Sequence, residues 1–224
     1  MAATGKAVDL RHMEHLKHLD LRGGTAEAWM FPPSVEFLAL EHHRPGVRHW
    51  MLPPYSVSKE HGLMLPNLKV LICGTTDDAA LLLLTSLEGN PMECIVRGQS
   101  TGIGSKLESL HISDPADLRR LGFFDRLEDL VDLSLPKART VDDGWAPWIA
   151  AHLHRLEKID LESSDITGYG LKKILEAAPQ MRSVNVKNCH YLSADASNWV
   201  RAKGIQINNT MEEAKRSGRK VRYW

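Results

Sequence analysis

The sequence has few cysteines, and its charges of opposite sign balance. Cys73, Cys94 and Cys189 are odd in number and far apart, and no C-x-x-C motif occurs. Neither a disulfide framework nor a structural zinc site is therefore indicated, and a reducing compartment, the cytoplasm or the nucleus, is expected. Lys and Arg together number 28, as do Asp and Glu, so the formal net charge is zero. This balance argues against a globally basic nucleic-acid-binding protein.

Long hydrophobic runs are also missing. The most apolar run, residues 81–84, is far shorter than the roughly 18 residues that a membrane-spanning helix needs. At the start of the chain, Asp9 and Arg11 interrupt the apolar residues, and no secretory-signal pattern is visible. We therefore expect no membrane partner.

Motifs typical of catalysis or of cofactor binding do not occur either. The sequence has no G-x-S-x-G motif, and the Gly/Ser-rich loop 98–106 lacks the Gly and Lys positions of a phosphate-binding loop. His12, His15 and His18 would share a face on a helix, but the strand pattern around His18 breaks that geometry. We therefore expect no metal site, no cofactor and no catalysis by this chain.

The chain is organised around a repeat that is complete within residues 156–186. Leu156, Ile159 and Leu161 have the spacing L-x-x-L-x-L, which returns at Met181, 25 residues later. Between the two patterns, apolar residues at helical spacing predict a helix over 167–178, which Pro179 ends. A strand, a turn, a helix and a return within about 25 residues are typical of one leucine-rich repeat.

The strand pattern occurs seven times in order, with start-to-start spacings of 19, 33, 39, 23, 26 and 25 residues. An eighth strand is predicted around Ile205 and Ile207. Further helices are predicted over 77–88, 115–121, 142–153 and 193–202, the last one ended by Gly204. The seven apolar triplets are Leu16-Leu19-Leu21, Val35-Leu38-Leu40, Leu68-Leu71-Cys73, Leu107-Leu110-Ile112, Leu130-Leu133-Leu135, Leu156-Ile159-Leu161 and Met181-Val184-Val186.

These patterns predict an α/β leucine-rich-repeat solenoid of the ribonuclease-inhibitor-like kind. A single domain over residues 1–209 would carry a parallel β-sheet on its concave face and helices on its convex face. A basic C-terminal tail is expected over 210–224. Residues 41–66, which are rich in Pro and Gly, are predicted to form an irregular excursion between two strands.

The C-terminal half resembles a known family. Residues 181–189, MRSVNVKNC, fit L-x-x-L-x-L-x-x-C, with Cys189 in the last place. Residues 165–171, DITGYGL, are close to the I-T-D-x-G-L that belongs to the cysteine-containing repeat subclass, and 141–145 and 190–196 are further variants. The chain therefore resembles the leucine-rich-repeat part of F-box proteins, fungal members especially, closely over 107–207 and loosely over 10–106. These proteins are the substrate receptors of cullin-type ubiquitin ligases.

The resemblance implies that Cys189 packs inward as an inert residue. It also implies a partner, the ligase adaptor, which would bind through an F-box. No F-box is visible, because the first strand pattern begins at Leu16 and the tail after Ile207 is short and charged.

The predicted function rests on the concave face. Residues that flank the second anchor of each strand should point away from the core, because side chains alternate along a strand. We expect this row to bind a protein partner, with an apolar N-terminal half and a polar C-terminal half; the alternative for the apolar half is burial under the excursion 41–66. The predicted binding residues are Phe37, Val70, Ile72, His111, Asp132, Lys158, Asp160 and Asn185.

Two functions therefore remain open from the sequence. The first is substrate recognition in an F-box (SCF-type) ubiquitin ligase, which the resemblance implies. The alternative is a free-standing leucine-rich-repeat interaction or structural subunit of a larger assembly.

Overall fold

The computed structural model describes residues 7–22, 28–40, 67–73, 107–113 and 127–209. The helices predicted over 77–88 and 115–121, the excursion 41–66 and the tail 210–224 lie outside the described residues. The chain divides into two compact units, Met1–Ser109 and Leu110–Trp224, called here the N-terminal and C-terminal units. Whether residues 1–209 form the single predicted domain stays a prediction.

The fold is α/β, with a parallel sheet of eight strands in the order β10-β9-β8-β7-β6-β5-β4-β2, and a second small sheet pairs β1 with β3. The eight strands of the large sheet coincide with the seven predicted triplets and the predicted eighth strand. Strands β1 and β3 were not predicted, because their sequences lack the triplet pattern. The bounds are β1 Ala7–Asp9, β2 His18–Asp20, β3 Ala28–Met30, β4 Phe37–Leu40, β5 Val70–Cys73, β6 Ser109–Ile112, β7 Asp132–Ser134, β8 Lys158–Asp160, β9 Ser183–Asn185 and β10 Gln206–Asn208.

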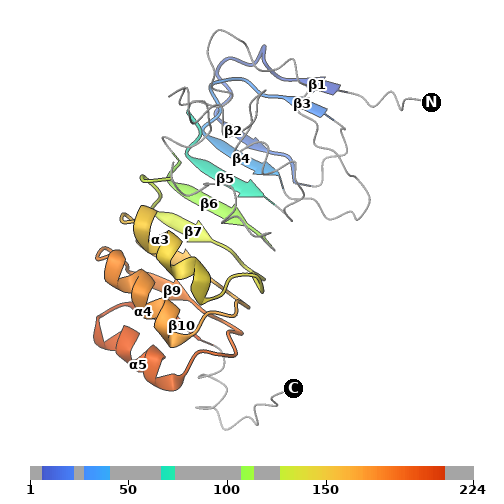
Figure 1. Ribbon diagram of the computed structural model, residues 1–224. Coiled ribbons are helices and arrows are strands. Elements are labelled where there is room, and N and C mark those ends of the chain that lie inside the picture. The colour runs from blue at the N-terminus through green and yellow to red at the C-terminus, as the bar shows by residue number, and fades with distance from the viewer. Residues whose placement is uncertain (1–6, 23–27, 41–66, 74–106, 114–126, 210–224) are drawn as a thin grey trace, which may run out of the picture. The chain divides into compact units, whose positions relative to one another are not determined.

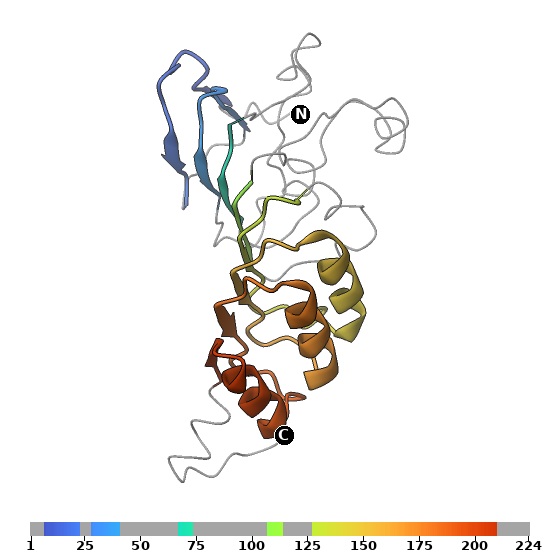
Figure 2. The ribbon, with the colours of Figure 1, turned by 90° about the vertical axis from the view of Figure 1, so that its left-hand side faces the viewer.

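Helices form one layer of the C-terminal unit. Figures 1 and 2 show α3, α4 and α5 side by side on one side of β7–β10, and in Figure 2 none of the described elements of this unit covers the opposite side of these strands. The predicted helix over 142–153 is realised as a 3-10 turn followed by an α-helix, and Gly204 follows the last helix at φ +77°. The bounds are η3 Asp143–Trp145, α3 Ala146–His152, α4 Gly168–Ala177 and α5 Ala194–Ala202.

Most of the described anchors of the predicted triplets belong to the buried core. In the C-terminal unit, Leu133, Leu156 and Leu161 are completely buried, and Ile159 is 2% exposed. The helices contribute their own apolar face, in which Ile174 is completely buried. Parallel registers such as Leu133↔Ile159↔Val184 place each anchor beside its equivalents in the neighbouring repeats. Each strand therefore buries its apolar face against its neighbours, as repeat architectures require.

The turn that follows each strand uses the same backbone conformation in successive repeats. Lys137, Ser163 and Asn188 have φ values of 61°, 61° and 58°, and each stands two residues after the third anchor of its strand. Backbone hydrogen bonds join each of the first two turns to the turn of the next repeat. The Lys137 amide donates to the Glu162 carbonyl, and the Ser163 amide donates to the Lys187 carbonyl. Only Asn among the three commonly tolerates this left-handed conformation, so the other two are held there by the repeat.

The prediction that Cys189 packs inward is confirmed, because this residue is 1% exposed. Its Sγ donates to the Leu161 carbonyl at 3.1 Å and lies 3.4 Å from the Ser164 hydroxyl. Burial raises the pKa of the Cys189 thiol, so its reactive thiolate form is disfavoured at neutral pH.

The helix N-termini of neighbouring repeats are fastened by one carboxylate. Asp143 accepts hydrogen bonds from the Thr167 amide at 2.8 Å and the Thr167 hydroxyl at 2.6 Å. Thr167 in turn caps α4, accepting from the Tyr169 amide. A Cβ atom on Gly170 would lie 2.3 Å from the Asp143 Oδ1. Gly170, the Gly of the I-T-D-x-G pattern, therefore makes room for the carboxylate of the preceding repeat.

Substitution of Gly170 tests this fastening. Gly170→Ala should destabilise the fold by about 1–3 kcal/mol, because the displaced carboxylate leaves the buried side of Thr167 unsatisfied, although Ala is the better helix former. In an Asp143→Ala background the same substitution should be neutral or stabilising. Urea denaturation of the four proteins of this double-mutant cycle measures the coupling, and an equal cost of Gly170→Ala in both backgrounds would contradict the arrangement.

Buried Cys189 gives a second prediction. Cys189→Asp should lower the free energy of unfolding by several kcal/mol, because a carboxylate would be buried without a cationic partner, whereas Cys189→Ala should cost about 1–2 kcal/mol. In the native wild-type protein a thiol reagent should label Cys189 far more slowly than in urea. Peptide mass mapping distinguishes Cys189 from the other cysteines, and rapid native labelling at this site would show that the residue is accessible.

Candidate functional site: the open face of the sheet

The N-terminal unit presents three of the predicted residues on one face. The register His18↔Phe37↔Val70 places these side chains beside one another, and the rings of His18 and Phe37 are stacked at 3.9 Å with an interplanar angle of 7°. Phe37, Val70 and Ile72 are all partly exposed, so none of them belongs to the fully buried core. Their role in partner binding stays a prediction, and the excursion that was the alternative cover lies outside the described residues.

One residue expected on this face is buried instead. Ala39 was predicted to point outward beside Phe37, but it is completely buried. Its register partners are Asp20 and Ile72, both larger. Ala39 therefore lies on the open side of its strand and is nevertheless shielded from water. Among the described strands of this unit, the partly exposed apolar residues of this row are Phe37, Val70 and Ile72.

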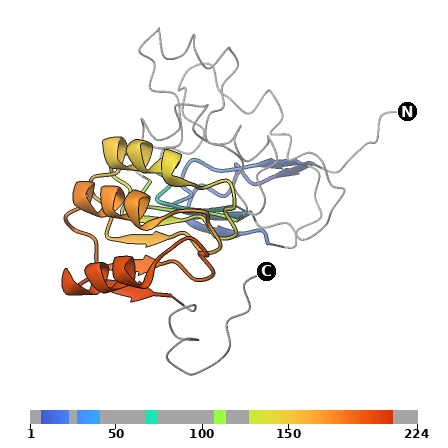
Figure 3. The same cartoon turned by 60° about the horizontal axis from the view of Figure 1, so that its bottom comes forward.

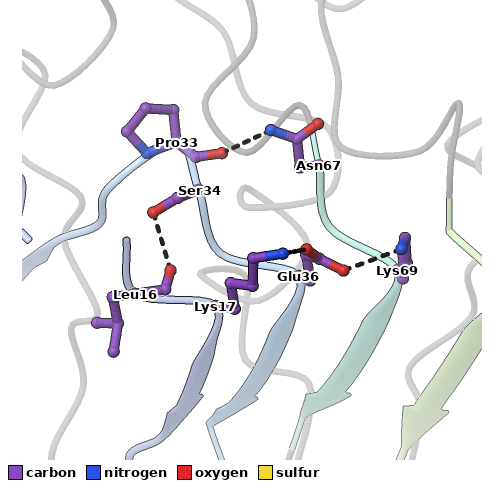
Figure 4. Close-up of polar contacts among 7 residues, drawn as sticks. All are labelled: Leu16, Lys17, Pro33, Ser34, Glu36, Asn67 and Lys69. Carbon is purple, nitrogen blue, oxygen red and sulfur yellow. Dashed lines mark hydrogen bonds and ion pairs between the residues drawn. The ribbon is translucent and has the colours of Figure 1, made fainter. Parts of the chain in front are cut away.

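An ion-pair bridge lies where three strands of this unit begin (Figure 4). Glu36 Oε1 is 2.8 Å from the Lys17 Nζ, and Glu36 Oε2 is 2.9 Å from the Lys69 Nζ. The same three residues share backbone hydrogen bonds, because the Glu36 amide donates to the Lys17 carbonyl and the Lys69 amide to the Glu36 carbonyl. Hydrogen bonds from the two ammonium groups lower the pKa of Glu36 from 4.5 to about 2. Alternating charges at equivalent positions thus favour this register of β2, β4 and β5.

Two further hydrogen bonds fix the loops that lead into these strands. The Ser34 hydroxyl donates to the Leu16 carbonyl at 2.9 Å, and the Asn67 side chain donates to the Pro33 carbonyl at 3.1 Å. Figure 4 shows both beside the ion-pair bridge. The segments before β4 and β5 are therefore each tied to the preceding repeat, which holds Phe37 and Val70 at the same level of the sheet.

In the C-terminal unit, the predicted polar residues form two rows across neighbouring strands. The first row follows the register Asp132↔Lys158↔Ser183, and the second follows Ser134↔Asp160↔Asn185. The residue between the two rows on each strand is a buried anchor. Both rows therefore lie on the side of the sheet that faces away from the helices.

The second row is a continuous chain of hydrogen bonds. Asn185 Nδ2 donates to the Asp160 Oδ1 at 2.9 Å, and the Ser134 hydroxyl donates to the Asp160 Oδ2 at 3.3 Å. His111 Nδ1 lies 2.8 Å from the Ser134 Oγ, and His111 Nε2 lies 3.1 Å from the Ser113 Oγ. Since the one hydroxyl proton of Ser134 goes to Asp160, Nδ1 of His111 is the donor to Ser134.

The same chain of hydrogen bonds also fixes the turns that follow β8 and β9. Asp160 Oδ1 accepts the Glu162 amide at 3.0 Å, and Asn185 Oδ1 accepts the Lys187 amide at 3.3 Å. Both carboxylate oxygens of Asp160 are therefore occupied. These side chains are held in one orientation, so a partner would meet an ordered surface with little side-chain entropy left to lose.

The surroundings of Asp132 raise the pKa of its carboxyl group. Burial raises the pKa of Asp132 and Asp160 raises it further, whereas the ammonium of Lys158 and, more weakly, His111 act in the opposite direction. The charged form of the Asp132 carboxyl group is thus disfavoured by its burial. A donor from a partner, or a cationic group, would relieve this cost.

Ser113 and His111 have the separation of a nucleophile and a base, but their surroundings do not support that chemistry. A neutral hydroxyl, that of Ser134, holds the other ring nitrogen, so the imidazolium form would lack the carboxylate that stabilises it in hydrolytic triads. Within the described ranges, no three His, Cys, Asp or Glu side chains gather as metal ligands would.

The structure brings His111, Asp132, Lys158, Asp160 and Asn185 together on one face of the C-terminal unit. The predicted set omitted Ser113 and Ser134, which complete the hydrogen-bond chain. A signal for Ser134 was present, because it occupies the same place before the third anchor as Asp160 and Asn185. Phe37, Val70 and Ile72 gather separately, within the N-terminal unit.

Comparison of the chain with protein-family models and with curated protein sequences returns no match. In the part of the chain that the structure describes, no helix has the length and apolar character needed to cross a membrane.

The low pKa of Glu36 gives a prediction for acid titration. A lowered pKa means that the ion-pair bridge stabilises the fold above the unfolded-state value of about 4.3, and that this stabilisation is lost as the pH falls toward 2. NMR titration of the Glu36 carboxyl should give a midpoint near 2 in the wild type. Removing both ammonium groups with Lys17→Met and Lys69→Met should return it toward 4.3, and an unchanged midpoint would show that the bridge does not form in solution.

Proposed function

We propose that this chain is a leucine-rich-repeat recognition domain that binds a protein partner through the open face of its parallel sheet. The observation that carries the proposal is the ordered polar surface of the C-terminal unit, where His111, Ser134, Asp160 and Asn185 are linked across successive strands. Further support comes from the repeated strand–turn–helix pattern, with a buried triplet and a left-handed turn residue in successive repeats.

The two halves of the row would contribute different chemistry. Phe37, Val70 and Ile72 would supply apolar contact area, and partly exposed aromatic and aliphatic side chains are common anchors at protein interfaces. Asp132, Lys158 and the Asp160 chain would supply oriented polar contacts, which select one partner over another because unmatched polar groups are costly to bury.

We further propose that the chain serves as the substrate-recognition part of an F-box-type ubiquitin ligase. The support is the resemblance of residues 107–207 to the cysteine-containing repeats of that family, including the I-T-D-x-G-like segment 165–171 and Cys189. The alternative is a free-standing interaction subunit of a larger assembly. Affinity purification of the full-length tagged protein followed by mass spectrometry separates the two, because only the first predicts the ligase adaptor and a cullin among the captured proteins.

Variants of the open face test recognition directly, with the captured partner as the readout. Phe37→Asp with Ile72→Asp should abolish capture while leaving the thermal midpoint within a few degrees, since both side chains are partly exposed. Asp132→Asn with Lys158→Gln should weaken capture about tenfold or more, because both remove oriented charges but leave the hydrogen-bond chain in place.

The matched control is Asp165→Asn with Arg139→Gln, which makes the same charge changes at exposed residues outside the strands. This control should bind like the wild type. Equal capture by all four proteins would exclude the open face as the binding surface. If the Phe37 and Ile72 double variant unfolds, the apolar row belongs to the core, and recognition rests on the polar rows alone.

A further inference from the structure

The helix layer of the C-terminal unit carries exposed aromatic residues that packing does not explain. Tyr169 is 68% exposed and Trp148 is 37% exposed, and Trp199 is partly exposed. Each of these rings is followed four residues later by a basic or imidazole side chain on the same helix. The pairs are Trp148–His152 on α3, Tyr169–Lys173 on α4 and Trp199–Lys203 at the end of α5.

These pairs are in contact. The Lys173 Nζ lies 5.6 Å from the centre of the Tyr169 ring, and the Lys203 Nζ lies 4.7 Å from the centre of the Trp199 ring. Lys172 reaches from α4 to the Trp199 ring on α5, with its Nζ 5.9 Å from the centre. The ammonium groups are thus arranged over aromatic rings across two neighbouring helices, which orients them at a modest gain in energy.

The repeat places these residues in a row. Trp148, Lys173 and Trp199 each follow the capping residue of their repeat by six positions, the caps being Asp142, Thr167 and Ser193. Figure 3 shows α3, α4 and α5 side by side in one layer. Equivalent positions on neighbouring helices lie on the same side of that layer, so the row runs across the helices on the side of the unit opposite the open sheet face.

Two helices of this layer carry an excess of positive charge. Helices α4 and α5, with Lys203, carry four cationic side chains and two anionic ones. Glu176 lies 3.7 Å from Lys172 and offsets part of its charge. The remaining excess is positive, whereas the central strands of the open face hold Asp132 and Asp160 against Lys158. The two sides of this unit are therefore suited to partners of different charge.

We propose that the helix layer of the C-terminal unit is a second docking surface, which binds an acidic segment of a partner protein through Lys172, Lys173 and Lys203 and the rings beneath them. Carboxylates would pair with ammonium groups that are already oriented, which lowers the entropy cost of binding. Apolar side chains of the same segment would cover the exposed parts of Tyr169 and Trp199. This site is separate from the open face and does not depend on the function proposed for it.

The geometry favours a carboxylate-bearing segment over a single-stranded nucleic acid. Bases bind such surfaces by stacking on the faces of aromatic rings. Here the faces of Trp199 and Tyr169 already carry ammonium groups, so a base would have to displace them. A carboxylate, in contrast, would pair with these ammonium groups in the positions that they already occupy.

The experiment uses the full chain and a short fluorescent peptide of alternating Glu and Leu residues, with binding followed by anisotropy. Lys172→Gln with Lys203→Gln should weaken binding about tenfold, because two exposed cationic contacts to the peptide are lost. The matched control, Lys137→Gln with Arg139→Gln, removes the same charge at exposed residues outside both proposed surfaces and should change the affinity less than about twofold. Trp199→Leu should also weaken binding, with a thermal melt to confirm that the variant folds.

Three results would overturn the proposal. The first is an equal loss of affinity in the charge-matched control, which would indicate attraction to net charge alone. The second is failure of the peptide to bind at low salt. The third is binding of an oligouridine RNA or of phosphatidylserine vesicles that is tighter than binding of the peptide and is abolished in the Lys172 and Lys203 variant. This result would assign the surface to nucleic acid or to lipid. Binding that weakens as salt rises and is lost only in the helix-layer variants supports the acidic partner.

Discussion

The burial of each strand's apolar face against the equivalent residues of its neighbours is the constraint on which the rest of the structure depends. Leu133, Ile159 and Val184 are in register and buried, and none of them could be removed from water by its own repeat. The strand, the left-handed turn at Ser163 and the cap at Thr167 all follow from keeping this register. Alternating charges at Lys17, Glu36 and Lys69 reinforce the same alignment in the N-terminal unit.

The same constraint leaves the other side of each strand available for recognition. Because side chains alternate, a fixed register for the anchors also fixes the register of Ser134, Asp160 and Asn185. Their hydrogen bonds to one another then orient them before any partner arrives. The helix layer is also held in register between repeats. The hydrogen bonds of Asp143 to Thr167 fix the start of α4 against the preceding repeat, and so fix the positions of the aromatic rings on these helices.

The sequence was sufficient for features that depend on burial and spacing. Strands β2 and β4 to β9 follow from apolar triplets, β10 follows from Ile205 and Ile207, and α4 follows from helical spacing between Thr167 and Pro179. Pattern reasoning missed β1 and β3, which pair through backbone hydrogen bonds and carry no triplet. It gave no sign that Ala39 is buried, because alternation along a strand predicts the side on which a residue lies and not its exposure. The His111–Ser134 contact was out of reach for a similar reason, since it depends on which donor meets which acceptor across two strands.

The outermost strands of the large sheet, β2 and β10, have anchors that are less well shielded from water than those of the inner strands. In β2 and β10, Leu19 and Ile207 are only partly buried, whereas the equivalent anchors of inner strands are almost completely shielded from water. Backbone amides at these ends should exchange with solvent through local fraying, while those of β8 should exchange only when its unit opens cooperatively. A partner that contacts an outermost strand would therefore suppress fraying, and could be bound tightly or released without disturbing the centre of the array.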